Sequence, residues 1–219
     1  MKFFQLEGTP REAGAVGKKA AKAIRKKNYI PAVLYGGVPV KLPYEGELSP
    51  GETLVKTGNN EGLIVTSLMV SKDSVRGLIY TPEVFLVDLS LKNGKKVKAI
   101  LKDIQTQPVT DEILHIDFIE IHEDKPIIIE VPIALHGHSE GVKAGGKLSL
   151  EMRKLKVKAL YKDIPEKLNI DITNMGLGKT IQVGSLNFDK MELVSAKNAV
   201  VCAVKLTRAA RGAAAASGK

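Results

Sequence analysis

Residues 11–37, REAGAVGKKAAKAIRKKNYIPAVLYGG, constrain the fold more than any other stretch of the chain. Within it, 14–27 holds six basic residues and no acidic one, among alanines that favour a helix. The residue before a proline is pushed out of the helical region, so Ile30-Pro31 predicts that the helix has ended. The apolar run 32–35 then leads into two glycines. The stretch therefore predicts a helix, a tight connection, a strand and a turn.

The basic residues of this helix gather on one face. At about 100° per residue, Lys18, Lys22 and Arg25 fall at i, i+4 and i+7, and Lys19 lies beside them. Arg11 precedes the helix and can add to the same charge. Such a face is either a solvated surface or a site for an anion. We favour nucleic-acid phosphate, because no acidic residue stands three or four positions away to relieve the repulsion between these cations.

The composition agrees with a polyanionic partner and excludes several classes of protein. The 219 residues carry a formal net charge of +9, and 44% are hydrophobic, enough for a core. The single cysteine, Cys202, excludes an intramolecular disulfide and a multi-cysteine zinc site, and its apolar run predicts a buried position. No apolar stretch is long enough to span a membrane and no signal peptide is recognisable, so we expect a cytoplasmic protein.

The first half of the chain predicts mostly strands. Two of them form a hairpin, because Asn93-Gly94 between apolar runs is the strongest short hairpin signal. Residues 38–62, rich in Gly, Pro and Asn, predict a loop or an irregular hairpin. The expected elements are strands at 2–7, 63–70, 84–91 and 96–104, and a short helix at 73–80.

The second half has a different character. Residues 119–206 contain short β-type runs separated by glycine-rich turns, with no convincing helix. We therefore predict a first domain at 1–122 and an all-β roll or sandwich at 123–206. The tail, 207–219, is basic and has no large apolar residue, so we expect it to be disordered. The β-type runs are 127–135, 148–160, 168–172, 179–183 and 198–206.

Two glycine-rich segments imitate the phosphate-binding P-loop. Residues 141–147, GVKAGGK, are followed by Leu148 where a Ser or Thr is needed to hold Mg²⁺. Residues 175–180, MGLGKT, have Thr173 in the place of the first glycine. Neither segment is preceded by a predicted strand and followed by a predicted helix, so we interpret both as turns.

Two histidines, His136 and His138, could chelate a metal at a strand edge. No third ligand is evident, and a turn explains the sequence better. We therefore expect no metal, no cofactor and no small-molecule substrate.

His115 and Asp117 are the remaining candidates for chemistry. In a strand over 114–118 they share one face, and the alternating residues Leu114, Ile116 and Phe118 face the core. A His–Asp pair suggests acid–base catalysis, but no Ser or Cys nucleophile motif accompanies it. With Gln105 and Gln107 the pair forms a set of side chains suited to base edges and 2′-hydroxyls. A polar strand face in solvent is the third alternative.

A series of motifs occurs in the order found in one protein family. Arg11 and Gly17-Lys18 open the series, and IPAVLYGG, KDIQxxPV and LHIDF follow at 30–37, 102–109 and 114–118. The second half adds EVP at 130–132, GVKAGG at 141–146 and DIP at 163–165. The chain resembles the bacterial large-subunit ribosomal protein that binds 5S rRNA, in its longer two-domain CTC or general-stress form. The resemblance covers nearly the whole chain except part of 38–62 and the tail.

This resemblance implies a mainly β fold with a few helices, in which an N-terminal β-barrel binds 5S rRNA in the central protuberance of the large subunit. It implies neighbouring ribosomal proteins as further partners, and no enzymatic activity. The alternative is a stress-related protein-interaction module that acts off the ribosome. The RNA-binding residues that the resemblance implies are Arg11, Lys18, Lys19, Lys22, Arg25, Tyr35, Gln105, Gln107, His115 and Asp117.

The implied contacts differ in kind. Lys18, Lys22 and Arg25 would contact phosphates, whereas Gln105, Gln107 and His115 would read bases and sugars. Asp117 would orient His115 or accept a hydrogen bond from a guanine amino group. The family often has Ser, Arg and His where this chain has Ala21, Lys22 and Gln107. A lysine loses the bidentate phosphate geometry of arginine, and a glutamine cannot be protonated.

Overall fold

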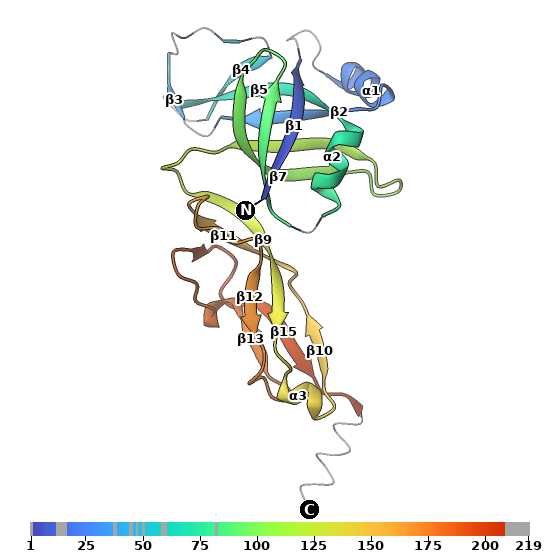
Figure 1. Ribbon diagram of the computed structural model, residues 1–219, viewed down its shortest axis with the longest axis vertical. Coiled ribbons are helices and arrows are strands. Elements are labelled where there is room, and N and C mark those ends of the chain that lie inside the picture. Colours follow the sequence, from blue (N-terminus) through green and yellow to red (C-terminus); the bar gives the residue numbers. More distant parts are fainter. Residues whose placement is uncertain are drawn as a thin grey trace, which may run out of the picture. The chain divides into compact units, whose positions relative to one another are not determined.

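The computed structural model describes residues 2–11, 17–36, 39–43, 46, 48–49, 51–57, 61–81 and 83–208. The chain divides into two compact units, 1–125 and 126–219, close to the boundary expected after residue 122. The described part contains fifteen strands and three α-helices (Figure 1). The predicted fold class, mainly β with a few helices, is confirmed.

Six strands of the first unit close into a barrel (Figure 1). Their order is β1–β6–β7–β8–β2–β5, and β5 pairs with β1 to complete the circle, Gly8 lying opposite Val70. The pairs β1–β6 and β2–β8 are parallel, and the others are antiparallel. The strands are β1 (Lys2–Pro10), β2 (Tyr29–Tyr35), β5 (Glu61–Ser71), β6 (Phe85–Leu91), β7 (Lys96–Thr106) and β8 (Ile113–Glu120).

Alternate residues of each strand fill the barrel. On β8, Ile116 and Phe118 have no exposed surface, whereas His115 and Asp117 point outward, as the period of two predicts. Burying a side chain as large as that of Phe118 contributes about 1.5–3 kcal/mol. The interior is therefore occupied by its own side chains, and the polar residues are confined to the outside.

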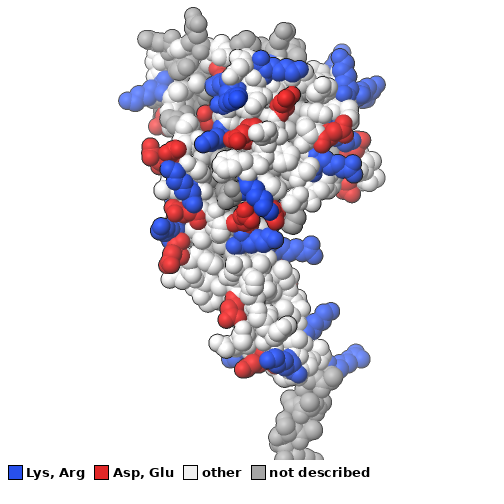
Figure 2. Space-filling model, viewed as in Figure 1, with Lys and Arg blue, Asp and Glu red and all other residues white. Residues whose placement is uncertain are grey.

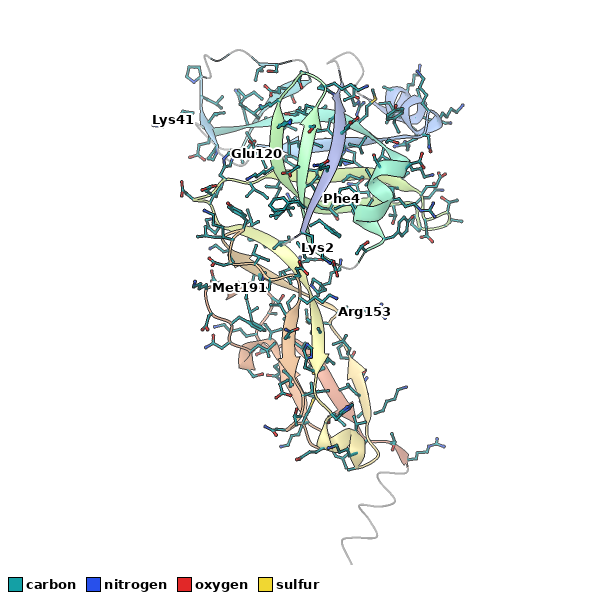
Figure 3. All side chains as sticks on the ribbon, in the orientation of Figure 1. Lys2, Phe4, Lys41, Glu120, Arg153 and Met191 are labelled. Atoms are coloured by element: carbon teal, nitrogen blue, oxygen red, sulfur yellow. The ribbon has the colours of Figure 1, made fainter. Side chains whose placement is uncertain are left out.

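Helix α2 (Lys72–Ile79) packs its apolar side onto the same core. It lies within one residue of the predicted helix, and Val75 and Leu78 are buried there. Next to it, Phe4 of β1 (labelled in Figure 3) meets Phe85 of β6 edge to face, with ring centroids 5.9 Å apart. The predicted hairpin between β6 and β7 is also confirmed, and Gly94 takes the positive φ that its turn requires.

Residues 38–62 contribute two strands beside the N-terminal half of β5. They are β3 (Val40–Lys41) and β4 (Glu52–Lys56), both antiparallel to β5. Figure 3 labels Lys41 at the side of the unit opposite helix α1 (Lys18–Lys26). Glu52 anchors this extension, because Lys95 Nζ donates to its Oε1 at 3.1 Å and the Ser49 N–H to its Oε2 at 3.0 Å.

The second unit is built from two sheets. One has the order β12–β9–β11–β14 and the other β10–β15–β13. Cys202 of β15 is buried beside Val204, as its apolar run predicted. The elements are β9 (Ile127–His136), α3 (Glu140–Lys143), β10 (Lys147–Leu150), β11 (Lys154–Ala159), β12 (Leu168–Asp171), β13 (Thr180–Gln182), the 3-10 helix η2 (Val183–Ser185), β14 (Glu192–Leu193) and β15 (Val200–Lys205).

Two details of the second unit correct the expectations. The single β-type run 148–160 is interrupted at 151–153, and its two halves, β10 and β11, belong to different sheets. The turn region after His138 contains one helical turn, α3, although no helix was expected there. Such a short helix has too few residues to show a 3.6-residue pattern.

His136, one of the two candidate metal ligands, already contacts another side chain. His136 Nε2 lies 2.9 Å from Asn169 Oδ1, so this ring already has a protein partner. Within the described residues, no group of three His, Cys, Asp or Glu side chains could hold a metal ion.

No helix in the described part is both long and apolar enough to cross a bilayer. The expected disorder of the tail falls outside the described residues, except for Thr207 and Arg208.

Candidate nucleic-acid interface

Helix α1 exposes its cations along one side of the barrel. Lys18, Lys19, Lys22 and Lys26 are exposed, and Figure 2 shows Lys and Arg atoms gathered where α1 lies in Figure 1. None of these four forms an ion pair within the described residues. Lys18 and Lys19 stand in the first turn, where the helix dipole disfavours positive charge, and no side chain caps that turn. An anion at this end would stabilise the helix.

The helix ends where the sequence predicts. Asn28 adopts a φ of 64°, the left-handed conformation common just after a helix, and its N–H donates to the Arg25 carbonyl at 3.1 Å. The Asn28 side chain donates to Asp73 Oδ2 of α2 at 3.0 Å. These contacts fix the connection between α1 and β2.

Arg25 also fixes the position of α1. Its Nη1 donates to the carbonyl of Leu114 at 3.2 Å, so the half-buried guanidinium ties the last turn of the helix to the start of β8. Leu114 immediately precedes His115. The exposed lysines of α1 and the polar face of β8 are therefore held next to each other.

Neighbouring strands bring four polar side chains to one outer face. His115 lies opposite Gln105 of β7, and Asp117 lies beside Val33 of β2, two residues before Tyr35. Because residues two apart on a strand share a face, Gln105, His115, Asp117 and Tyr35 all point away from the core. The strands that form this face, β7, β8 and β2, are adjacent in the sheet, although β2 lies far from the other two in the sequence.

His115 and Asp117 contact each other directly. His115 Nδ1 lies 2.8 Å from Asp117 Oδ1, and the two side chains are 26% and 17% exposed. This Oδ1 is buried and has no well-aligned donor within the described residues, so the contact is close but poorly directed. The pair can hold the imidazole in one orientation and leave its Nε2 for an outside partner.

Tyr35 and Lys102 extend this face. The Lys102 ammonium lies over the Tyr35 ring, 5.2 Å from its centroid, a cation–π geometry. Burial, followed by the charge of Asp117, raises the pKa of Tyr35, so its hydroxyl remains a hydrogen-bond donor at neutral pH. Lys102 stands at a break in the register between β7 and β8. The sequence pattern did not predict that Lys102 lies over Tyr35, because strand alternation cannot reveal a bulge.

The two remaining predicted residues lie elsewhere. Arg11 is only 8% exposed, its backbone N–H donates to the Ser67 carbonyl at 2.9 Å, and burial lowers the pKa of its guanidinium. It therefore does not join the exposed face of α1, which corrects the expectation. Gln107 is half-buried in the β7–β8 turn, where its N–H donates to the Glu112 carbonyl at 2.8 Å.

Comparison with known proteins decides the family. Residues 6–47 and 55–118 match the ribosomal L25p family, and residues 126–208 match the C-terminal domain of ribosomal protein TL5. The chain belongs to the ribosomal L25p family. It is therefore a ribosomal protein and not an enzyme, and it works in the cytoplasm on the ribosome, as the sequence predicted.

Curated relatives match over almost the entire chain. The protein named large ribosomal subunit protein bL25 from Porphyromonas gingivalis is 59% identical over 214 residues, which are 98% of both chains. Proteins of the same name from Parabacteroides distasonis and Bacteroides thetaiotaomicron are 56% and 53% identical, covering 97% and 100% of this chain and 98% and 100% of theirs. The L25p match breaks at 48–54, within the extension that β3 and β4 form.

Proposed function

We propose that this L25p-family protein binds 5S rRNA in the large ribosomal subunit. The RNA would bind to a surface that we name the RNA face. It combines the exposed cations of α1 with the polar outer face of β7, β8 and β2. Its residues are Lys18, Lys19, Lys22, Tyr35, Gln105, His115 and Asp117.

The observation that carries this proposal is the charge of α1. Its exposed lysines have no carboxylate partner within the described residues, and Arg25 holds them beside the polar strand face. Lysines without partners supply phosphate contacts, whereas Gln, His and Tyr supply hydrogen bonds and stacking for bases and 2′-hydroxyls. The particular RNA is inferred from the motif resemblance, and the large subunit from the names of the relatives.

Arg25 has two roles in this proposal. Its position on the helix suits a phosphate contact, but its bond to the Leu114 carbonyl also holds α1 on the barrel. Replacing Arg25 would therefore remove a charge and loosen the helix at once. A clean test of the phosphate contacts uses the exposed lysines instead.

The test is a filter-binding titration of 5S rRNA at several salt concentrations. It compares the intact chain with Lys18→Ala/Lys22→Ala, and with the control Lys156→Ala/Lys158→Ala on β11. We expect tight binding by the intact chain and about a tenfold or greater loss in the α1 variant. The slope of log K against log salt should fall by about 2, because each lost phosphate contact removes about 0.9. The β11 control should stay within about twofold of the intact chain.

Two results would overturn the proposal. If the intact chain did not bind 5S rRNA at low salt, the alternative of a protein-interaction module off the ribosome would gain support. If the α1 and β11 variants lost equal affinity, binding would follow net charge alone, and α1 would not be the contact surface.

A further inference from the structure

The two glycine-rich segments that imitate P-loops meet at one end of the second unit. The Gly141 N–H donates to the Met175 carbonyl at 2.9 Å, and the buried Ser139 hydroxyl donates to the same oxygen at 2.6 Å. A Cβ on Gly141 would lie 2.6 Å from the carbonyl carbon of Gly176, and one on Gly146 would lie 2.6 Å from Val204. These glycines allow two backbones to pack closely, which explains the motif without a nucleotide.

The same packing brings cations from four segments to one end of the unit. Lys143 ends α3, and Lys147 begins β10 directly opposite Lys205 of β15. The Lys179 carbonyl accepts the Val204 N–H at 3.0 Å, which places Lys179 beside the same strand. The Thr207 hydroxyl donates to the Gly145 carbonyl at 2.6 Å and so holds Arg208 near this turn. We name this surface the basic tip; it consists of Lys143, Lys147, Lys179, Lys205 and Arg208.

Most of these cations lack a carboxylate partner. Lys205 contacts Glu151 at 2.7 Å, but the other four form no ion pair within the described residues. All five are exposed, and Figure 2 shows Lys and Arg atoms around this end of the unit. Of the nearby carboxylates, Asp171 accepts two hydrogen bonds from Thr173, and Glu140 lies in the first turn of α3.

The arrangement costs stability in the free protein. Lys147 and Lys205 face each other across an antiparallel pair, where like charges repel. The next residues along the chain, 207–219, add Arg211 and Lys219 and no acidic residue. A polyanion bound here would relieve the repulsion at the tip and could continue along the tail.

We propose that the basic tip is a second RNA-binding surface, which contacts backbone phosphates independently of the RNA face. Lysine is depleted at protein–protein interfaces but is a usual partner of phosphate, so the five cations fit RNA better than an acidic protein. The partner is an RNA backbone without sequence preference, because these side chains offer charges rather than a set of groups that distinguish bases. The inference does not depend on 5S rRNA as the partner of the first unit.

The experiment uses the full chain and a mixed-sequence RNA duplex of about 20 base pairs, longer than a single double-strand-binding module spans. All proteins carry Lys18→Ala/Lys22→Ala, so that α1 does not mask the tip. The tip variant adds Lys143→Gln, Lys147→Gln and Lys179→Gln. The matched control adds Lys154→Gln, Lys156→Gln and Lys158→Gln on β11, which removes the same charge from the same unit. Fluorescence anisotropy at several salt concentrations measures affinity and salt slope.

We expect the tip variant to lose about tenfold or more in duplex affinity, with a salt slope lower by about 2–3, and the control to stay within about twofold. Equal losses in the two variants would overturn the proposal, because net charge alone would then explain binding. Polyglutamate serves as a second probe. If the tip variant bound polyglutamate more weakly but bound the duplex with unchanged affinity, the tip would bind an acidic protein. This result would also overturn the proposal.

Thermal unfolding of both variants shows whether they remain folded. All substituted side chains are exposed, so the melting temperature should change little. A failed 5S rRNA titration together with a positive tip result would reject the RNA face alone. The opposite pair of results would reject the tip alone.

Discussion

Helix α1 exposes four lysines and strand β11 three, but within the described residues only lysines of β11 are opposed by carboxylates. On β11, Lys156 lies 3.9 Å from Glu130 of β9, and Lys158 lies 3.5 Å from Glu192 of β14. On α1, the exposed lysines have no such partner within the described residues. Strand pairing places opposite charges side by side, whereas a helix at the rim of a barrel has few neighbours beyond its own turns.

The difference shows which charged surface is available for a partner. A lysine that already contacts a carboxylate must give up that contact before it binds phosphate, and a lysine without one need not. The same distinction separates the basic tip from β11 within the second unit. A count of basic residues in the sequence would not show which of these surfaces has carboxylate partners.

The largest effect should come from removing a base or sugar contact, rather than a phosphate contact, from the RNA face. His115→Ala should weaken 5S rRNA binding by about 1–3 kcal/mol, because a base or sugar contact is lost. The salt slope should not change, in contrast to the α1 variant, because no phosphate contact is removed. Filter binding over a salt series measures both quantities. A slope lowered by about 1 would mean that His115 contacts a phosphate.

A smaller effect, on the free energy of unfolding, should come from Glu52 of the first unit, which is paired with Lys95. Burial acts to raise the pKa of Glu52, but hydrogen bonds from the Ser49 N–H and from Lys95 outweigh it, and the net pKa is lowered. The Glu52 side chain is only 7% exposed. Glu52→Gln should therefore lower the free energy of unfolding by about 1 kcal/mol at pH 7.

The pH dependence follows from the lowered pKa. A carboxyl group with a lower pKa in the folded state stabilises the fold fully above its unfolded pKa, about 4.3, and loses this contribution as pH falls through the folded pKa. The gap between the intact chain and Glu52→Gln should thus narrow from pH 7 to pH 3 in urea unfolding. A gap that stayed constant would show that packing, not charge, is responsible.

The smallest effect should be at the exposed pair on β11. Glu192 is 72% exposed, and surface pairs of this kind contribute about 0–1 kcal/mol. Glu192→Gln should change the free energy of unfolding by less than about 0.5 kcal/mol and show little pH dependence. Glu192→Gln should also remove the carboxylate partner of Lys158. A rise in duplex RNA affinity would then support the contrast between the paired lysines of β11 and the lysines of α1. A loss of unfolding free energy as large as that of Glu52→Gln would contradict the prediction for this exposed pair.

Much of the fold could be predicted from local patterns. The helix at α1, the Asn93-Gly94 hairpin and the alternation on β8 depend on residues close in the sequence, and the structure has all three. The split between β10 and β11 could not be predicted, because the interrupting residues 151–153 carry no strong turn signal. The sheet to which each half belongs depends on partners far along the chain.

The sequence by itself determined the family, the mainly β fold and the identity of the cationic helix, because these depend on residue order and short-range periodicity. Only the tertiary structure decided that Arg11 is buried, that Arg25 binds the Leu114 carbonyl, and that Lys102 lies over Tyr35. It also decided which lysines meet a carboxylate. Each of these contacts joins residues from different elements, and strand register, which no local pattern specifies, sets which residues meet.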